Sequence, residues 1–307
     1  MAALTFDLHR HLEGSIRAET LLEIAREFRV PRVSDDLAIF RRYVEMAPED
    51  PRTFRVFLSK FNGIKPFWVD RRAIEWAARA SVSDAADEGV RHLELRFNPT
   101  FFCLERGFAP REAAEWIADA ARAEARARGL TVKFVACLIR HLPPEVNLPT
   151  LEIALEGGLY AGLDLAGDES VSDGLDYVGA FRSAAERGLG ITVHAGELWG
   201  TGRHISEAVE RFGARRIGHG TCAFRDPRLL DLCIGSGVTF EICPTSSSMT
   251  GQVTGIHPAG IARGARIVVG TDDPAIYGTS LPKEADKAAG SGLMIADLNK
   301  AARAAAF

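Results

Sequence analysis

The chain of 307 residues is 47% hydrophobic and 25% charged, which is typical of a globular protein and argues against a disordered, collagen-like or coiled-coil chain. Its 37 Lys and Arg residues and 41 Asp and Glu residues give a formal net charge of −4. A protein that binds nucleic acid usually has an excess of basic residues, so nucleic acid is not expected as a main partner. Five cysteines without a CxxC pair favour reduced thiols in the cytoplasm, and no segment predicts a signal peptide or a membrane span.

Eight short apolar runs alternate along the chain with segments whose apolar residues recur at helical spacing. The runs cover residues 4–8, 92–97, 132–138, 160–165, 191–193, 216–217, 239–243 and 267–269. Strands that alternate with helices predict one (β/α)8 TIM barrel over residues 1–307, with its functional side chains at the carboxyl ends of the strands. A doubly wound open sheet is the alternative, but no GxGxxG motif follows the first run.

The segment between the first two runs, residues 18–90, is too long for a simple crossover, and we expect it to form additional helices that cover a pocket. Within it an apolar stripe with the spacing i, i+3, i+4, i+7 comprises Phe54, Phe57, Leu58 and Phe61. Such a stripe ordinarily packs a helix onto the core. The alternative is an apolar lid over a bound small molecule.

Four of the eight histidines lie at the ends of three predicted strands: His9 and His11 after the first, His194 after the fifth and His219 after the sixth. In a barrel these strand ends converge on one pocket. Residues two apart in a strand face the same way, so both histidines of the first strand can face one metal ion. An isolated HxH pair is more often incidental, and the prediction of a metal therefore depends on the other strands.

Those strands complete a ligand set. His194 and one carboxylate of the Asp272–Asp273 pair add a third nitrogen and an oxygen to His9 and His11, a combination that suits zinc. Many binuclear barrel hydrolases bridge two metals with a lysine from strand four, whereas residues 160–170 contain no lysine. We therefore expect one zinc ion per chain.

Two further side chains at these strand ends could move protons, and a pair of carboxylates lies beside them. Glu197 follows His194 by three residues and could act as a general acid, although a solvated turn glutamate is the ordinary alternative. A neutral His219 could take a proton from an activated water, or be a hydrogen-bonded core histidine. Asp272 and Asp273 cannot easily both stay charged in a small pocket unless a cation or a ligand donor satisfies them.

Six motifs, in this order along the chain, resemble those of the adenosine deaminase family of metal-dependent hydrolases: His9-x-His11-Leu-Glu-Gly, Leu165-Ala-Gly-Asp-Glu, His194-Ala-Gly-Glu, Arg216-Ile-Gly-His-Gly, Cys243-Pro-Thr-Ser and Thr271-Asp-Asp-Pro. The resemblance implies one zinc held by His9, His11, His194 and Asp272, and no organic cofactor. It also implies that Glu197 protonates purine N1, that His219 orients and deprotonates the water, that Asp273 contacts the water and N7, and that the Gly167 backbone contacts N3.

The expected activity is therefore zinc-dependent hydrolytic deamination of a 6-aminopurine nucleoside or base. Glu13 departs from the pattern, because adenosine-specific members usually carry an aspartate there that contacts the ribose; glutamate resembles the adenine, aminodeoxyfutalosine or modified-nucleotide branches. The alternatives are a mononuclear zinc barrel hydrolase acting on an amide or ester, and a barrel that binds purine nucleosides without turnover. The sequence leaves the oligomeric state open.

Overall fold

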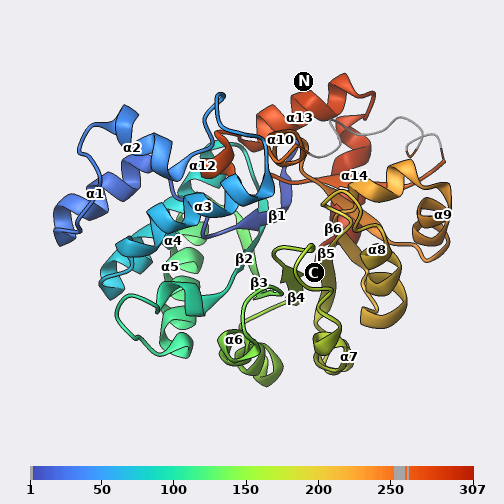
Figure 1. Ribbon diagram of the computed structural model, residues 1–307, viewed down its shortest axis with the longest axis horizontal. Coiled ribbons are helices and arrows are strands. Elements are labelled where there is room, and N and C mark those ends of the chain that lie inside the picture. Colours follow the sequence, from blue (N-terminus) through green and yellow to red (C-terminus); the bar gives the residue numbers. More distant parts are fainter. Residues whose placement is uncertain (1–2, 252–259, 261–262) are drawn as a thin grey trace.

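The centre of the computed structural model, which describes residues 3–251, 260 and 263–307, is an eight-stranded parallel sheet in the order β1 to β8 (Figure 1). The strands are β1 Phe6–His11, β2 His92–Phe97, β3 Thr131–Ile139, β4 Gly162–Ala166, β5 Gly190–Ala195, β6 Arg216–His219, β7 Thr239–Ile242 and β8 Arg266–Val269. Main-chain hydrogen bonds close the ring after β8: His11 donates to the Asp272 carbonyl over 2.8 Å, and Asp272 donates to the His9 carbonyl over 2.7 Å. The predicted (β/α)8 barrel is confirmed.

The first strand differs from the prediction. An apolar run at residues 4–8 is expected, but β1 spans Phe6–His11 and includes both histidines. Its pairing with β2 is irregular between Asp7 and Arg10, as in a β-bulge. Polar residues are tolerated in this buried strand because they have partners: the Arg10 guanidinium donates to Glu88 over 2.6 Å and to Thr271 over 2.9 Å.

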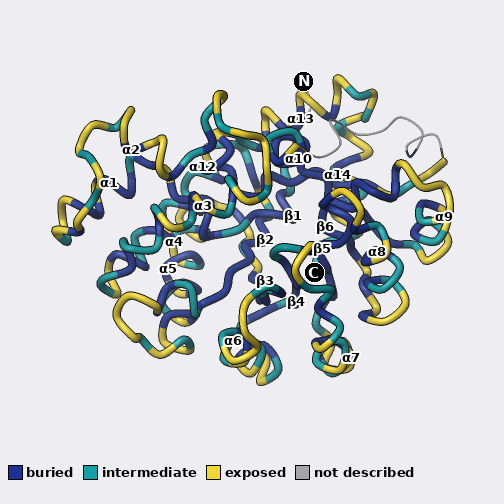
Figure 2. The backbone as a smooth tube through the Cα atoms, viewed as in Figure 1, coloured by how far each residue is buried: buried dark blue, intermediate teal, exposed yellow. Residues whose placement is uncertain are grey.

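Helices surround the barrel and expose their outward faces, whereas the strands are largely buried (Figure 2). They are α1 Ala18–Phe28, α2 Leu37–Val44, α3 Phe54–Ile64, α4 Arg71–Asp87, α5 Pro110–Arg128, α6 Pro144–Glu156, α7 Val178–Glu186, α8 Arg203–Glu207, α9 Pro227–Gly235, α10 Pro244–Met249, α12 Pro274–Tyr277, α13 Leu281–Gly290 and α14 Ile295–Ala305. The long segment after β1 contributes α1 to α4, as expected for additional helices.

Phe307 packs at the opposite end of the barrel from the strand ends that carry the histidines. A Cβ atom on Gly162 or Gly190, the first residues of β4 and β5, would lie 2.6 Å or 2.1 Å from its ring. The ring centroid lies 3.5 Å from the Arg216 guanidinium carbon, and the Phe307 N–H donates to Glu94 over 2.7 Å. The two glycines therefore make room for an aromatic plug at this end of the barrel.

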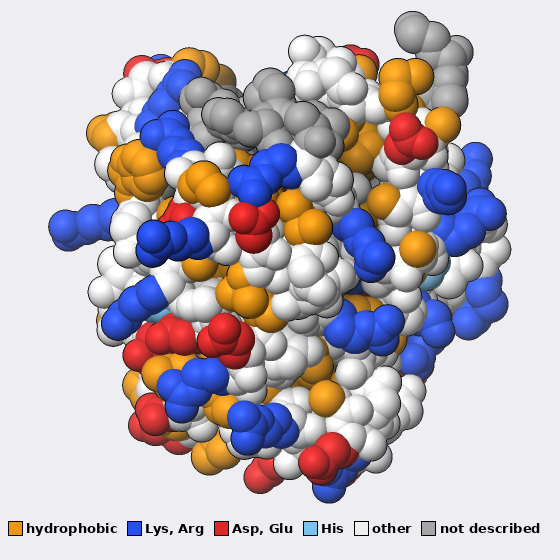
Figure 3. All heavy atoms as spheres, turned by 90° about the vertical axis from the view of Figure 1, so that its right-hand side faces the viewer, with side chains coloured by type: hydrophobic (Ala, Val, Ile, Leu, Met, Phe, Trp, Pro, Cys, Tyr) orange, Lys and Arg blue, Asp and Glu red, His pale blue; other side chains and the backbone are white. Residues whose placement is uncertain are grey.

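The surface on the side of α8 and α9 carries both acidic and basic side chains, with apolar side chains scattered among them (Figure 3). All five cysteines are buried and unpaired. Among the described residues, no helix combines the length and apolar character needed to cross a membrane.

Candidate active site

Three histidine nitrogens and one carboxylate oxygen converge at the carboxyl ends of the strands. His11 Nε2 lies 3.3 Å from His194 Nε2 and 3.4 Å from Asp272 Oδ1. His9 Nε2 lies 3.4 Å from the same Asp272 oxygen. His9, His194 and Asp272 are at most 3% exposed. The barrel thus brings the four predicted ligands together from β1, β5 and the residues after β8.

This arrangement fits a tetrahedral metal ion. Two ligands at roughly 2.0–2.1 Å from a tetrahedral zinc would be about 3.3–3.4 Å from each other. Three of the ligand pairs show this spacing: His11 with His194, His11 with Asp272, and His9 with Asp272. His9 Nε2 is buried and has no hydrogen-bond partner among the described residues. A buried nitrogen without a partner is costly unless a ligand satisfies it. The geometry and donor set therefore suit a metal.

The other nitrogens of His9 and His194 are held by carboxylates. His9 Nδ1 lies 2.7 Å from Glu241, and His194 Nδ1 lies 3.1 Å from Asp164. Arg96 bridges both carboxylates, donating to Asp164 over 2.7 Å and to Glu241 over 2.9 Å. Such carboxylate–histidine pairs fix the ring orientation and direct Nε2 toward a metal. The structure thus provides an outer layer that orients the ligands.

His219 approaches the same centre from β6. Its Nε2 lies 4.0 Å from Asp272 Oδ2, which is the oxygen that His9 and His11 do not approach. Within 4.8 Å, ligand atoms of His219 also group with those of His9, His194 and Asp272. His11 is nevertheless favoured as the metal ligand, because it lies as close to Asp272 Oδ1 as His9 does. His219 then lies beside the metal site and is not one of its ligands. Burial lowers the pKa of His219 well below 6.5, although the negative charge of Asp272 acts to raise it. The imidazole is therefore neutral.

The backbone is strained at two of these residues. His219 and Asp272 have φ values of 60° and 63°, and only one other non-glycine residue in the described part of the chain, Arg29, has a positive φ. Non-glycine residues in this region are held there by their surroundings and cluster at functional sites. The strain is therefore a second, independent indication of function at these strand ends.

Glu197 faces His219 with its Oε1 3.8 Å from the imidazole Nε2. Burial, and then the negative charges of Asp272 and Glu169, raise the pKa of Glu197 well above 4.5. A raised pKa favours the protonated carboxyl group, which is the state that a general acid needs. The solvated turn glutamate considered from the sequence is wrong, because Glu197 is only 3% exposed.

Asp273 and Glu13 face the pocket as carboxyl groups with raised pKa values. Burial, and then the charge of Asp272, raise the pKa of Asp273 well above 3.8, and its Oδ1 has no partner among the described residues. Gly14 permits its position, because a Cβ there would lie 1.9 Å from that oxygen. Burial raises the pKa of Glu13 to about 7; its Oε1 accepts a hydrogen bond from Asn98 N over 2.7 Å, while its Oε2 is unpaired within the described structure.

One pocket of about 280 Å³ contains these groups. Eight of the nine predicted site residues line it; His9 lies behind the others and contacts Asp272. Gly167 is part of the lining, with a φ of +97°, and a Cβ there would lie 2.6 Å from His141 Nδ1. All four residues of the apolar stripe on α3 also line the pocket, and Phe57 additionally stacks on Tyr277. The stripe thus covers the pocket as well as packing on the core.

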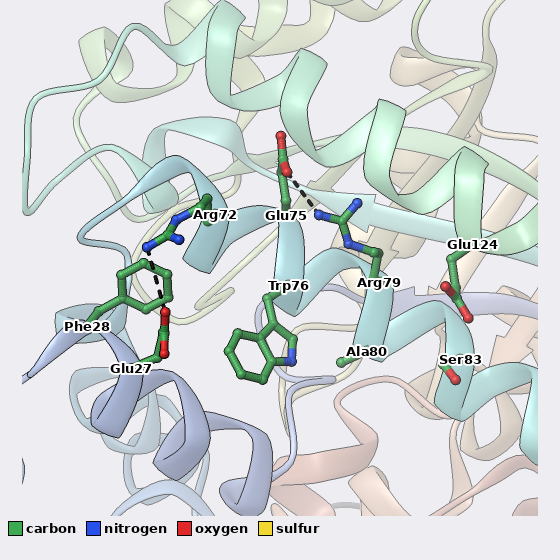
Figure 4. Close-up of a pocket in the computed structure, with 9 residues that line it drawn as sticks. All are labelled: Glu27, Phe28, Arg72, Glu75, Trp76, Arg79, Ala80, Ser83 and Glu124. Atoms are coloured by element: carbon green, nitrogen blue, oxygen red, sulfur yellow. Dashed lines mark hydrogen bonds and ion pairs between the residues drawn. The ribbon is translucent and has the colours of Figure 1, made fainter.

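A larger hollow of about 640 Å³ lies outside the barrel, between α1, α4 and α5 (Figure 4). Figure 4 shows Arg72 directed at Glu27 and Arg79 paired with Glu75, with Trp76 between them. These charges neutralise one another, and no strand-end residue reaches the hollow. The barrel pocket is therefore the candidate active site.

Several residues of the site have no assigned role in the sequence analysis. Asp164 directly precedes the Leu165-Ala-Gly-Asp-Glu motif and Glu169 is its last residue, so the motif is a signal that could have found them. Arg96 and Glu241 are charged residues inside apolar strands, which is also a usable signal, since a buried charge needs a partner. His204, whose Nδ1 lies 3.0 Å from Glu169, lies on α8 and gives no such signal.

Known proteins are similar to this chain over nearly its whole length. The model of the adenosine deaminase family matches residues 5–306. An adenosine deaminase of Erwinia tasmaniensis is 35% identical over 96% of this chain and 90% of its own. An adenosine deaminase of Serratia proteamaculans is 34% identical over 91% of this chain and 85% of its own. An adenine deaminase from Arthrobacter aurescens has the same fold, with a TM-score of 0.89 at 23% identity over 100% of this chain and 94% of its own. An Arabidopsis N6-mAMP deaminase has a TM-score of 0.83 at 27% identity, covering 99% and 93%.

Proposed function

Because this chain belongs to the adenosine deaminase family, and is thereby a hydrolytic deaminase acting on purines, we propose that it removes the 6-amino group of a 6-aminopurine nucleoside or base with one zinc ion per chain. The observation that carries the proposal is the convergence of three histidine nitrogens and one carboxylate oxygen, three pairs of which lie 3.3–3.4 Å apart, beside a buried glutamate. The purine would occupy the pocket of about 280 Å³ with its amino-bearing carbon toward this centre.

His9, His11, His194 and Asp272 would hold the zinc. When bound there, zinc supplies a Lewis acid that lowers the pKa of water from 15.7 to about 7 and so provides a nucleophile at neutral pH. The hydrogen bonds of His9 to Glu241 and of His194 to Asp164 support this assignment, because they leave Nε2 of each ring free for a metal.

His219 and Asp273 would orient the attacking water. A neutral imidazole can accept the water proton at Nε2, and the lowered pKa of His219 keeps it neutral. Asp273 has a raised pKa and an unpaired oxygen in the described structure, so its protonated carboxyl can donate to N7 of the purine. The main chain of Gly167 would donate to N3, and Glu13 would contact the group on N9.

Glu197 would act as the general acid. As the water oxygen adds to the amino-bearing carbon, the ring nitrogen N1 takes the proton of Glu197, so negative charge does not build up on the purine. A second proton, which comes from the water, goes to the amino group. The carbon–nitrogen bond then breaks and ammonia leaves. The remaining hydroxyl proton, which also came from the water, passes to the Glu197 carboxylate, so that the 6-oxopurine forms and the acid is protonated again. Water is the only co-reactant, so no organic cofactor is needed.

The test is a panel of adenine, adenosine, 5′-modified adenosines and aminodeoxyfutalosine, followed by the absorbance change of deamination, with metal analysis of the same protein. We expect turnover and one zinc per chain. Glu197→Gln should keep the metal and lose about 10²–10⁴-fold in kcat, since a positioned general acid contributes this much. The matched control is Glu210→Gln, at an exposed glutamate, which should keep the metal and the parent kcat.

Three results would contradict the assignment. Two metals per chain would make the site binuclear. Full activity in His194→Ala would remove this histidine from the ligand set. Loss of zinc in Glu197→Gln would make the glutamate a ligand instead of an acid.

A further inference from the structure

One wall of the active-site pocket depends on buried side-chain amides. The wall lies at the ends of β2 and β3, where Asn98 and Ile139 line the pocket together with Glu13. The main-chain N–H of Asn98 donates to Glu13 Oε1 over 2.7 Å, which leaves Oε2, unpaired in the described part of the chain, for a ligand. The position of the Glu13 carboxyl group, which we expect to contact the group on N9, therefore depends on the position of Asn98.

The side chain of Asn98 is fixed by three hydrogen bonds. Its Oδ1 accepts from the Thr100 N–H and from the Thr150 hydroxyl, each over 2.9 Å, and its Nδ2 donates to Asn147 Oδ1 over 3.2 Å. The contact with Thr100 caps the short helix Pro99–Phe102. Asn147 and Thr150 both lie on α6 and are buried, so α6 anchors the residues that follow β2.

Asn147 joins this anchor to β3. Its side-chain amide pairs with both main-chain groups of Ile139: Oδ1 accepts from the N–H and Nδ2 donates to the carbonyl, each over 2.9 Å. Nδ2 also donates to the Tyr177 hydroxyl over 2.8 Å. With Asn98 as the fourth partner, both acceptor positions and both donor positions of the amide are filled. This one amide therefore fixes the ends of β2 and β3 relative to each other.

A buried amide with four partners specifies one arrangement of its neighbours. An apolar side chain could fill the same space in several arrangements, whereas the amide is satisfied in only one, and every unpaired group would be costly. Neither asparagine has a role in the chemistry proposed above. We propose that Asn98 and Asn147 are positioning residues that hold the carboxyl group of Glu13 in place and thereby determine how strongly the enzyme discriminates between N9 groups. This inference rests on the proposed deamination.

The test is the ratio of kcat/KM for adenosine to kcat/KM for adenine, two compounds that differ only in the group on N9. A loss of folded or zinc-loaded protein lowers both values equally and cancels in the ratio. Asn147→Asp keeps the shape of the side chain but turns a carboxylate oxygen toward the Ile139 carbonyl. We expect it to move the ratio by at least about fivefold toward the value of Glu13→Ala. Thr150→Val, which keeps the shape and removes one hydrogen bond to Asn98, should move the ratio less and in the same direction.

A double mutant shows whether the asparagines act through Glu13. In a Glu13→Ala background, Asn147→Asp should change the ratio by less than about twofold, because the group that it positions is gone. Asn299→Asp is the matched control. This asparagine lies on α14 and also pairs with main-chain groups, those of Thr5 and Ala3 before β1, at the opposite end of the barrel from the pocket. It should leave the ratio at the parent value.

Three results would overturn the inference: a parent ratio equal to that of Glu13→Ala, a parent ratio that survives in Asn147→Asp and Thr150→Val, or a shift that persists without Glu13. Calorimetric Kd values for the 6-oxo compounds inosine and hypoxanthine give the corresponding ratio without turnover. If no 6-aminopurine is deaminated, the proposed function fails, and this Kd ratio still decides for or against the asparagines. If neither 6-oxo compound binds, the inference fails too, because the pocket then selects no purine substituent.

Discussion

Glu169 holds the main chain of Glu197 in place: its Oε1 accepts a hydrogen bond from the Glu197 N–H over 2.8 Å. Its other oxygen accepts from the Gly196 N–H over 2.8 Å and lies 3.0 Å from His204 Nδ1. A single buried carboxylate therefore fixes the turn that presents the proposed general acid. Glu169 touches no substrate in this arrangement and is a positioning residue.

We predict that Glu169→Gln lowers kcat by about 10- to 100-fold with a small change in KM, because a displacement of the acid affects the transition state more than substrate binding. A glutamine oxygen can accept in one place, but its NH₂ group would face the other main-chain N–H. Steady-state kinetics check this, with zinc content measured in parallel. Glu186→Gln, at an exposed position on α7, is the control. Equal loss of zinc and activity would indicate a merely structural role.

The same carboxylate predicts a pH dependence of stability. Burial alone would raise the pKa of Glu169, but the hydrogen bonds from His204 and the main chain and the charge of Arg140 lower it below 4.5. A folded-state pKa below the unfolded one stabilises the protein above the unfolded value, and this stabilisation is lost as the pH falls through the folded value. The difference in unfolding free energy between the parent and Glu169→Gln should therefore be constant well above pH 4.5 and should narrow as the pH falls through and below this value. Urea titrations check it; a constant difference would contradict it.

The sequence predicts the barrel because the apolar runs and helical spacings recur with little interruption, and β2 has the predicted bounds. The sequence predicts the site residues because the carboxyl ends of the strands meet in a barrel, whatever the length and conformation of the loops. It does not predict the end of β1, since His9 and Arg10 are polar, and only their partners far along the chain, Glu241 on β7 and Glu88 after α4, explain their burial. The sequence does not predict the positioning role of Glu169 either, because its contact with the Glu197 main chain is made across the fold.

Asp164 is predicted to tune metal affinity. It accepts from Arg96 and holds His194 Nδ1, and removing such an outer partner typically weakens metal binding by 10–100-fold. Asp164→Asn should therefore raise the Kd for zinc by about 10–100-fold while the chain stays folded. Competition with a chromophoric chelator measures this, and circular dichroism checks the fold. An unchanged Kd would show that His194 is oriented without Asp164.

Phe307 is predicted to stabilise the barrel. Its ring fills the space over Gly162 and Gly190 and lies on the Arg216 guanidinium. Phe307→Ala should lower the free energy of unfolding by about 2 to 4 kcal/mol, since the ring is partly exposed and fully buried rings contribute somewhat more. Urea unfolding measures the change. Met294→Ala, at a side chain that is 66% exposed, should change stability by less than about 0.5 kcal/mol. Equal effects of the two substitutions would show that the plug is not stabilising.

Glu13 is predicted to select the substrate through its buried carboxyl group. One oxygen is held by Asn98 N over 2.7 Å and the other is unpaired within the described structure, so a substrate group can bind there. In Glu13→Asp the carboxyl group is shorter by one methylene, and it can no longer keep the Asn98 contact while reaching the same point. A site built around a polar contact discriminates strongly against ligands that leave it unpaired. We therefore expect Glu13→Asp to raise kcat/KM for adenosine relative to adenine and aminodeoxyfutalosine by at least about tenfold. Glu13→Gln, which keeps the length, should shift this ratio less. If adenosine is already the best substrate of the parent and Glu13→Asp changes no ratio, Glu13 does not determine specificity.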